Sequence, residues 1–133
     1  MNYYFAKVAN CTFEEAVQQT IEALRQEGFG VPTDIDIQAT LKKRLDVDFK
    51  KYRILGACHP SSAFKALQAE DKIGTMLPCN VIVQEVAPGK VEIAAVNPIA
   101  SMMAVQNTQL GEIATAITQK LQRVIEGLPG ANQ

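Results

Sequence analysis

The sequence predicts an α+β fold, in which helices pack on a mainly antiparallel or mixed sheet. Segments of alternating apolar residues, typical of strands, are interleaved with segments of helical spacing in the order β-α-β-α-β-α-β-β-α. Two β-branched runs follow one another across a tight-turn sequence, which indicates that part of the sheet is antiparallel. The 133 residues contain no linker, repeat or low-complexity segment. We therefore expect residues 1–133 to form a single domain.

The first strand and the first helix carry clear local signals. Residues 2–9 place apolar and aromatic side chains on both faces of a short strand. Thr12 and Glu15 have the spacing of a capping box, in which each side chain accepts a hydrogen bond from the other residue's backbone N–H. Apolar residues then recur at helical spacing as far as Gly28, a residue type that favours the end of a helix. The pattern predicts a helix over residues 12–27.

The middle of the chain predicts a strand, a helix and a second strand. In GFGVPTDIDI (28–37), Pro32 cannot donate a backbone hydrogen bond, which favours the edge of the sheet. Asp36 is placed to cap the helix that follows. The composition of YRILGAC (52–58) is typical of a buried strand. We expect the strand within residues 28–37 and the helix that follows it to turn these side chains inward: Phe29, Val31, Ile35, Ile37, Leu41 and Leu45.

A third helix is predicted to begin at Pro60, with His59 as its N-cap, because proline is tolerated in the first turn. It runs to about Glu70 with Phe64 and Leu67 turned inward, and a loop follows. The runs 81–86 and 91–96 then form a hairpin around an Ala-Pro-Gly-Lys turn. A short helical piece over 97–103 precedes the last helix, which spans about 109–126 and has the most regular apolar stripe.

Composition and charge exclude several classes of protein. The chain is 47% hydrophobic and 20% charged, which is typical of globular proteins and not of disordered ones. Its net charge of −1 provides no overall attraction to nucleic acid or to a membrane surface, and no apolar run reaches the length of a membrane span. Three cysteines and the absence of a secretory-signal pattern predict a cytoplasmic protein with free thiols.

Three stretches of the sequence together carry a resemblance to a known family. They are TDIDIQATLKKRLDVDFKKYRILGACHP (33–60), IGTMLPCNVIVQEV (73–86) and NPIASMM (97–103). From about Thr12 to Leu128 the chain resembles the family named domain of unknown function 302, most specifically at 52–60 and 77–81. The resemblance implies an α+β fold, a cytoplasmic bacterial or archaeal protein, a homodimer and no agreed activity. Family members usually carry Asn where this chain has His59, so a role for His59 would belong to this protein alone.

Cys58 and Cys79 are the strongest candidates for a functional site. Cys58 ends one predicted strand and Cys79 begins another. If the two strands are antiparallel neighbours, the end of the first meets the start of the second and the thiols approach each other. If the strands are parallel, the thiols lie at opposite ends. Together with His59 and Asn80, the two cysteines predict a pocket at the strand ends that binds a small ligand.

The same residues allow more than one chemistry. Two close thiols can hold a soft metal ion such as zinc or copper, with His59 as a third ligand, or they can cycle through a disulfide. The structural alternative is that the cysteines serve as small buried hydrophobes, because the chain has no C-x-x-C motif. In the same way, a histidine directly before a helical proline is more often a cap or a solvent-exposed residue than a ligand.

Two further clusters were weighed for function. Six of the thirteen basic residues lie within residues 42–53, where two aspartates reduce the local charge to +4, leaving −5 on the rest of the chain. Without an aromatic stacking motif or a recognition helix, we interpret this segment as a solvated face that suits an acidic partner surface. Met102 and Met103 point about 100° apart on a helix, so one can fill the core while the other lines a pocket or a partner surface.

The sequence supports three functional hypotheses. The leading one is a non-catalytic binding module for a small ligand or a soft metal ion at the Cys58/Cys79 pocket. The second is a thiol redox protein that uses the same pair, and the third is a structural domain whose exposed apolar residues form a dimer interface. No spacing of Ser, His and Asp or of paired carboxylates predicts an enzyme.

Overall fold

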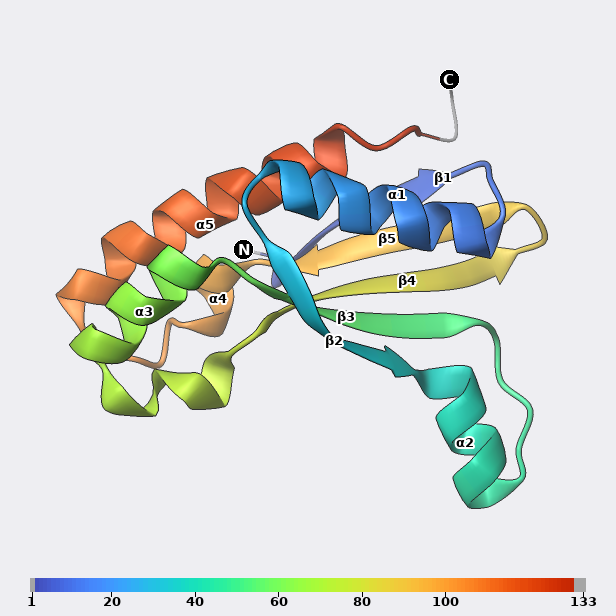
Figure 1. Ribbon diagram of the computed structural model, residues 1–133, viewed down its shortest axis with the longest axis horizontal. Helices are drawn as coiled ribbons and strands as arrows, with labels where there is room; N and C mark the ends of the chain where they lie inside the picture. Colours follow the sequence, from blue (N-terminus) through green and yellow to red (C-terminus); the bar gives the residue numbers. More distant parts are fainter. Residues whose placement is uncertain (1, 131–133) are drawn as a thin grey trace.

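The computed structural model describes residues 2–130 and confirms the predicted α+β fold (Figure 1). The strands are β1 (Tyr4–Ala9), β2 (Gly30–Asp36), β3 (Tyr52–Cys58), β4 (Cys79–Ala87) and β5 (Lys90–Val96). The helices are α1 (Phe13–Gln26), α2 (Ile37–Leu45), α3 (Pro60–Ala69), the 3-10 helix η1 (Asp71–Met76), α4 (Pro98–Ser101) and α5 (Thr108–Glu126). No helix among these residues is long and apolar enough to span a membrane.

The five strands form one sheet in the order β1-β5-β4-β3-β2, and every neighbouring pair is antiparallel. The hairpin β4–β5 forms as predicted, with Gly89 at a positive φ of 72° in its turn. β2 lies at the edge of the sheet, and its pairing with β3 shifts register between Gly30 and Thr33. Pro32 lies within that irregularity, where its missing N–H removes no regular hydrogen bond.

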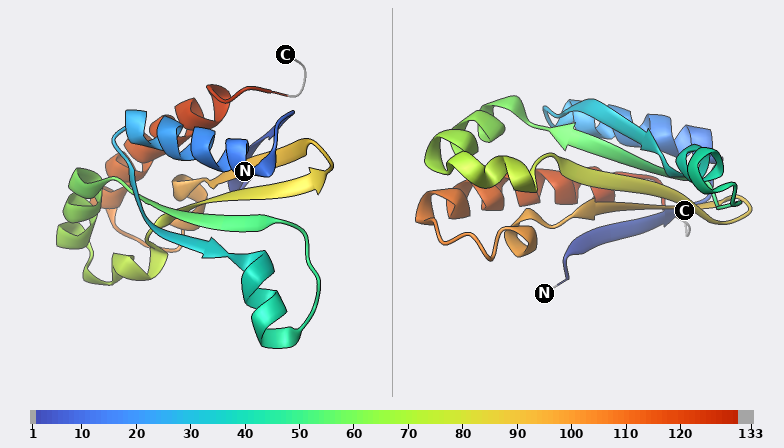
Figure 2. Two further views of the ribbon diagram at one scale, coloured as in Figure 1. Left: turned by 45° about the vertical axis from the view of Figure 1, so that its right-hand side comes forward. Right: turned by 90° about the horizontal axis from the view of Figure 1, so that it is seen from below.

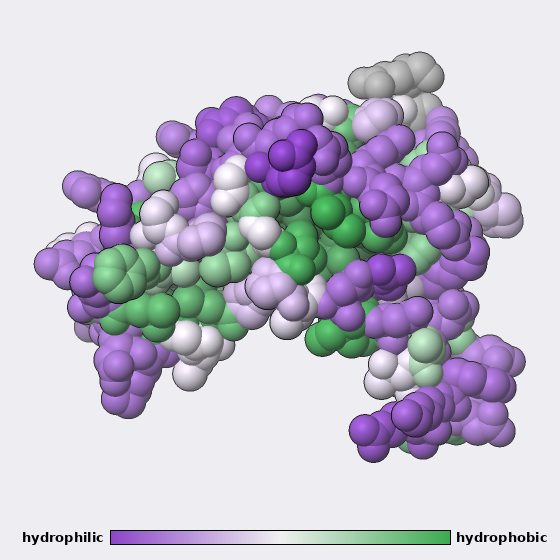
Figure 3. Space-filling view, viewed as in Figure 1, coloured by the Kyte–Doolittle hydropathy of each residue, from purple (hydrophilic) through white to green (hydrophobic). Residues whose placement is uncertain are grey.

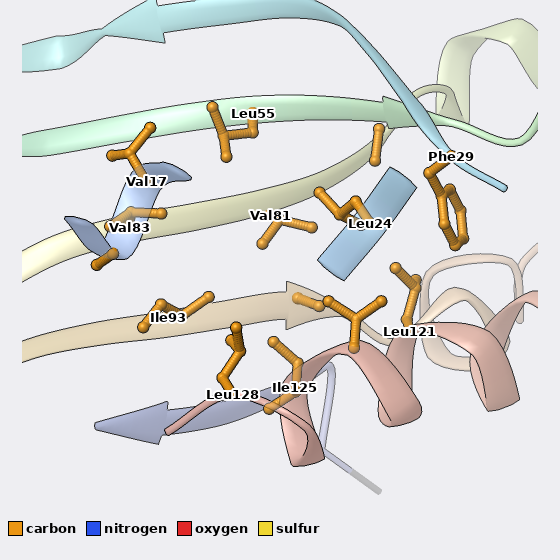
Figure 4. Close-up of a cluster of buried hydrophobic side chains, with 14 of the residues drawn as sticks. Val17, Leu24, Phe29, Leu55, Val81, Val83, Ile93, Leu121, Ile125 and Leu128 are labelled. Carbon is orange, nitrogen blue, oxygen red and sulfur yellow. The ribbon is translucent and has the colours of Figure 1, made fainter. Parts of the chain in front are cut away.

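The main core lies between the sheet and two helices, α1 and α5 (Figure 4). Leu24 on α1 and Leu121 on α5 are fully buried against the inward residues of the strands. The inward set on the central strands includes Leu55, Val81 and Val83, all completely buried. Burial of each such side chain stabilises the fold by about 1.5–3 kcal/mol. These contacts place one face of the sheet under the helices.

Local capping signals in the sequence are confirmed in detail. The Thr12 hydroxyl accepts a hydrogen bond from Glu15 N–H, and Thr12 N–H donates to the Glu15 carboxylate, both at 3.1 Å. The Asp36 side chain accepts from Ala39 N–H at the start of α2. His59 is the N-cap residue of α3, but its side chain makes no capping hydrogen bond. Residue-level signals of this kind act within a few positions of the chain, which explains why they can be recognised without the fold.

Four predicted inward side chains are instead exposed, which corrects the expectation. Ile35 is 46% exposed because its direct partner in β3 is Ile54, which places Ile35 on the sheet face that the helices leave open. Leu45 is exposed because α2 projects away from the body (Figures 1 and 2). On α3, Phe64 is 63% exposed and Leu67 is also exposed. That helix turns its small residues inward, where Ala66 packs with Ile73 of η1 and Leu110 of α5.

Gly56, in the middle of β3, is required by packing. A Cβ atom there would lie against Thr33 Oγ1 and 2.7 Å from Pro78 Cγ, and the proline ring cannot rotate away. We predict that Gly56→Ala lowers the free energy of unfolding by about 1–3 kcal/mol. Gly111→Ala is the control, because Gly111 is an exposed position of helix α5 with no atom near the added Cβ. This variant should gain up to about 1 kcal/mol of stability. Urea denaturation measures both changes, and equal effects would contradict the packing argument.

Candidate functional site

A pocket of about 270 Å³ opens at the end of the sheet where β3 finishes and β4 starts. Its floor includes Ala57 of β3 and Ala114 and Ile117 of α5, all buried. Ala63 and Ala66 of α3 line one side, and Met102, which follows α4, also contributes. Small side chains on α3 leave this space unfilled, because alanine cannot reach across the gap between the helix and the sheet.

Strand pairing brings Cys58 and Cys79 to this pocket. β3 and β4 are antiparallel neighbours, with Ala57 directly opposite Cys79, so Cys58 lies one position beyond the pair. Both cysteines line the pocket. Burial, with a smaller effect from the charge of Cys58, raises the pKa of the Cys79 thiol to about 11. Cys79 is therefore a neutral thiol at physiological pH.

The two thiols are neighbours without the arrangement of a disulfide. All three cysteines of the chain are free. Cys79 shares the face of Ala57, its direct partner, whereas the alternation along β3 turns Cys58 towards the other face. A disulfide requires the two Cβ atoms to lie about 3.5–4.5 Å apart and to point towards each other. Redox cycling of this pair would therefore need the strand ends to move, and it stays an untested prediction.

His59 lies beside the cysteines and also lines the pocket. Its ring packs edge-on against Phe29, with the ring centroids 5.4 Å apart. Ser61 Oγ lies 3.5 Å from Nδ1, at the limit of a hydrogen bond. Burial, followed by the positive charge of Lys120, lowers the pKa of His59 from its usual value of 6.5. The imidazole is therefore neutral at pH 7 and can accept or donate a hydrogen bond at the pocket.

The fourth predicted site residue, Asn80, is not brought to the same place. It is exposed and lines a different hollow, on the sheet face that the helices leave open. Cys79 and Asn80 are consecutive in β4, so their side chains point to opposite faces. The pocket thus joins Cys58, His59 and Cys79, and leaves Asn80 outside.

The metal ligands predicted from the sequence line one pocket but do not form a compact donor group. Among residues 2–130, no three or more His, Cys, Asp or Glu side chains are grouped so as to hold a metal ion. Asp34 and Asp36, two carboxylates close together on β2, have structural partners. The Asp34 carboxylate accepts from Arg53 Nε at 2.7 Å, and Asp36 caps α2. Metal binding at Cys58, His59 and Cys79 therefore stays a prediction.

Sequence reasoning missed several residues that shape the pocket. Ala63 and Ala66 are three positions apart on α3 and were passed over in favour of the larger Phe64 and Leu67. The two alanines have the same spacing as the larger pair, so spacing alone does not decide which pair faces inward. The sequence did not decide which of Met102 and Met103 lines a pocket, and the structure places Met102 there while Met103 is exposed.

The fold and the pocket define a small α+β domain with an apolar pocket at one end of a five-stranded antiparallel sheet. Residues 5–128 match the family described as domain of unknown function DUF302, and the chain belongs to that family. It is similar to the crystal structure of an uncharacterized conserved DUF302 protein from Bacillus stearothermophilus. That likeness has a TM-score of 0.86 and 25% sequence identity, and covers 95% of this chain and 98% of the other. No curated protein matches the chain.

The raised pKa of Cys79 predicts a stability change at alkaline pH. The thiol ordinarily titrates near 9.0, and in the folded chain its pKa is about 11. The folded state then keeps the proton to higher pH than the unfolded state does. The free energy of unfolding should therefore fall between about pH 9 and 11, with Cys79 contributing at most about 3 kcal/mol.

Urea denaturation from pH 8 to 11 measures this effect against a Cys79→Ala variant. Tyrosines and lysines titrate in both proteins, so the difference between the two pH profiles isolates Cys79. A smaller decrease is expected in the variant. Parallel profiles would contradict the burial of a neutral thiol at this position.

Proposed function

We propose that the protein is a non-catalytic binding module whose pocket takes a small, mainly apolar ligand. The observation that supports this function is the pocket of about 270 Å³ at the Cys58/Cys79 strand ends. Ligand sites in proteins are mostly concave and apolar, with a few polar groups that orient the ligand. The pocket has this character, because most of its lining is alanine, leucine, isoleucine, proline, phenylalanine and methionine.

Burial along the pocket wall sets the orientation of the ligand. The deepest residues, Ala57, Ala66 and Ala114, are buried and apolar. Of the polar residues of the wall, Cys58, His59 and Ser62 are half-buried and Thr33 is exposed, whereas Cys79 is buried. A ligand would place its apolar part on the floor and a single polar group at the mouth, within reach of the neutral imidazole.

The energetics favour an apolar occupant over water. A volume of about 270 Å³ corresponds to roughly nine water molecules at ~30 Å³ each. Water on an apolar floor finds few hydrogen-bond partners, and an apolar group that displaces it gains affinity. Each Å² of apolar surface removed from water contributes about 25 cal/mol before the cost of association is subtracted.

A titration of isotope-labelled protein with 1-octanol and with indole, followed by NMR, tests the proposal. Saturable shifts are expected at the backbone resonances of β3, α3 and α5 that border the pocket. Ala63→Leu should raise the Kd at least tenfold, because the larger side chain occupies the space of the ligand. Ala116→Leu, the same change on the exposed face of α5, should leave the Kd unchanged. Absence of binding, or equal binding by both variants, would contradict the proposal.

A soft metal ion is the second candidate occupant of the pocket. The supporting observation is that three sulfur-bearing residues and a histidine, namely Cys58, Cys79, Met102 and His59, all line the pocket. Thiolate and thioether ligands select copper(I), and thiolate with imidazole suits zinc. Binding would require rotation of these side chains and loss of the Cys79 proton.

Metal analysis of untagged protein, purified without a chelator, separates the two candidates. The second candidate predicts about one zinc or copper per chain, lost in the Cys58→Ser/Cys79→Ser variant and retained in Cys11→Ser, which changes a cysteine outside the pocket. Titration of the metal-free protein with zinc and with copper(I) extends the test. No bound metal in either experiment, together with binding of octanol or indole, would leave the apolar ligand as the function.

A further inference from the structure

We infer that the pocket takes a small monocarboxylic acid, whose carboxylate is held at the mouth by Lys120 and His59. This inference rests on the proposed function and narrows the ligand to one chemical class. It is supported by a lysine without an ion pair beside the polar end of the pocket, by a lining without acidic residues, and by the volume.

Lys120 lies near the polar end of the pocket. It is three positions beyond Ile117 on α5, which places both on one side of the helix, and Ile117 lines the pocket. α3 packs on α5, and His59, the residue directly before α3, also lines the pocket. Burial and, after it, the positive charge of Lys120 lower the pKa of His59, so the ammonium group lies close enough to act on the imidazole.

Lys120 is available for a ligand because its acidic neighbour is already paired. Arg123 Nη2 and Nε donate to Glu27 Oε1 at 2.9 and 3.1 Å. The pKa of Glu27 is lowered chiefly by that hydrogen bond and least by the charge of Lys120. Lys120 itself forms no ion pair with any residue from 2 to 130. It is half-buried, and a partly buried cation gains more from an anionic partner than a fully solvated one does.

The charge at the mouth suits a carboxylate. No Asp or Glu of residues 2–130 lines the pocket, so no lining group repels an anion. The neutral imidazole of His59 and the hydroxyl of Ser62 can donate hydrogen bonds to its oxygens. A single ammonium group balances a charge of −1, whereas a phosphate of about −1.5 to −2 would stay partly uncompensated.

The apolar part of the pocket fits a chain of medium length. A cavity of ~150 Å³ holds benzene, so the volume of about 270 Å³ has room for on the order of ten non-hydrogen atoms. Octanoate has this size, with an alkyl chain for the buried floor and one charged end. Figure 3 shows a similar division on one side of the molecule: hydrophobic residues gather around α3 and over the body, and hydrophilic residues cover α1 and α5.

A comparison of octanoate with 1-octanol tests the inference, because both have the same number of carbon atoms and only octanoate is charged. NMR titration should give octanoate a Kd at least tenfold below that of 1-octanol in about 0.05 M salt, and a smaller advantage in about 0.5 M. A pocket that selects only apolar surface would prefer the alcohol, since a carboxylate costs more to remove from water.

Variants of Lys120 assign the preference to its charge. Lys120→Met keeps an unbranched apolar side chain, so it should raise the Kd for octanoate at least tenfold and leave that for 1-octanol unchanged. Lys120→Arg retains the charge and should retain the preference. Lys90→Met is the matched control: it removes the same charge from an exposed residue at the opposite end of β4 from Cys79.

His59 is the only histidine of the chain, so its NMR titration reports directly on the mouth. In the free protein, Lys120→Met should raise the pKa of His59 towards 6.5, because a repelling charge is removed. Octanoate should also raise the pKa of His59, whereas 1-octanol should not, because only an anion stabilises the imidazolium. The other groups against the ring, Phe29, Gly28 and Ser61, do not titrate.

The outcomes separate this inference from the proposed function. If 1-octanol binds as tightly as octanoate, the inference is wrong and the proposed function stands. If neither compound binds, both fail. A preference for octanoate that survives in Lys120→Met, or that Lys90→Met also abolishes, would overturn the inference, because the charge at the mouth would not be its cause. Urea denaturation of each variant distinguishes a loss of affinity from a loss of folding.

Discussion

The antiparallel pairing of β3 with β4 is the constraint on which the rest of the structure depends. Its register sets Ala57 against Cys79 and buries Leu55 and Val81 completely under the helices. A slip of one residue would turn these side chains to the open face and bring Ile54 and Ile82 inward. Because the strand ends are fixed by the same register, it also decides which residues meet at the pocket. The site is therefore a consequence of how the core is packed.

The pocket exists because the end of the sheet is covered by small side chains. α1 and α5 bury large residues against the middle of the sheet, where Leu24 and Leu121 leave no gap. Beyond that region α3 approaches with Ala63 and Ala66, which cannot fill the space above Ala57. Close packing normally removes such volume from protein interiors. The pocket is open to solvent on one side, so it is a hollow at the edge of the core and not an interior void.

Local features of the fold could be predicted from the sequence, whereas those set by distant contacts could not. The capping box at Thr12 and the strand over 52–58 depend on neighbouring residues, and the structure confirms both. From the sequence, the proximity of Cys58 and Cys79 could be predicted only on the condition that their two strands are antiparallel neighbours. The inward face of α3 was misjudged, because Phe64 and Ala63 belong to apolar stripes of equal spacing. Which of the two stripes faces inward depends on the packing of distant parts of the chain around α3. The sequence of the helix alone does not show this packing.

β3 joins the pocket to the far end of the sheet. It begins at Tyr52, which borders the hollow on the open face, and ends at Cys58, in the pocket. Its seven residues span roughly 20 Å, at ~3.3 Å per residue. This strand is paired on both sides and includes the completely buried Leu55, so it is held in a rigid, close-packed element. Because such elements transmit displacement, a movement of Cys58 at the pocket would also displace Tyr52, which borders the hollow on the open face of the sheet.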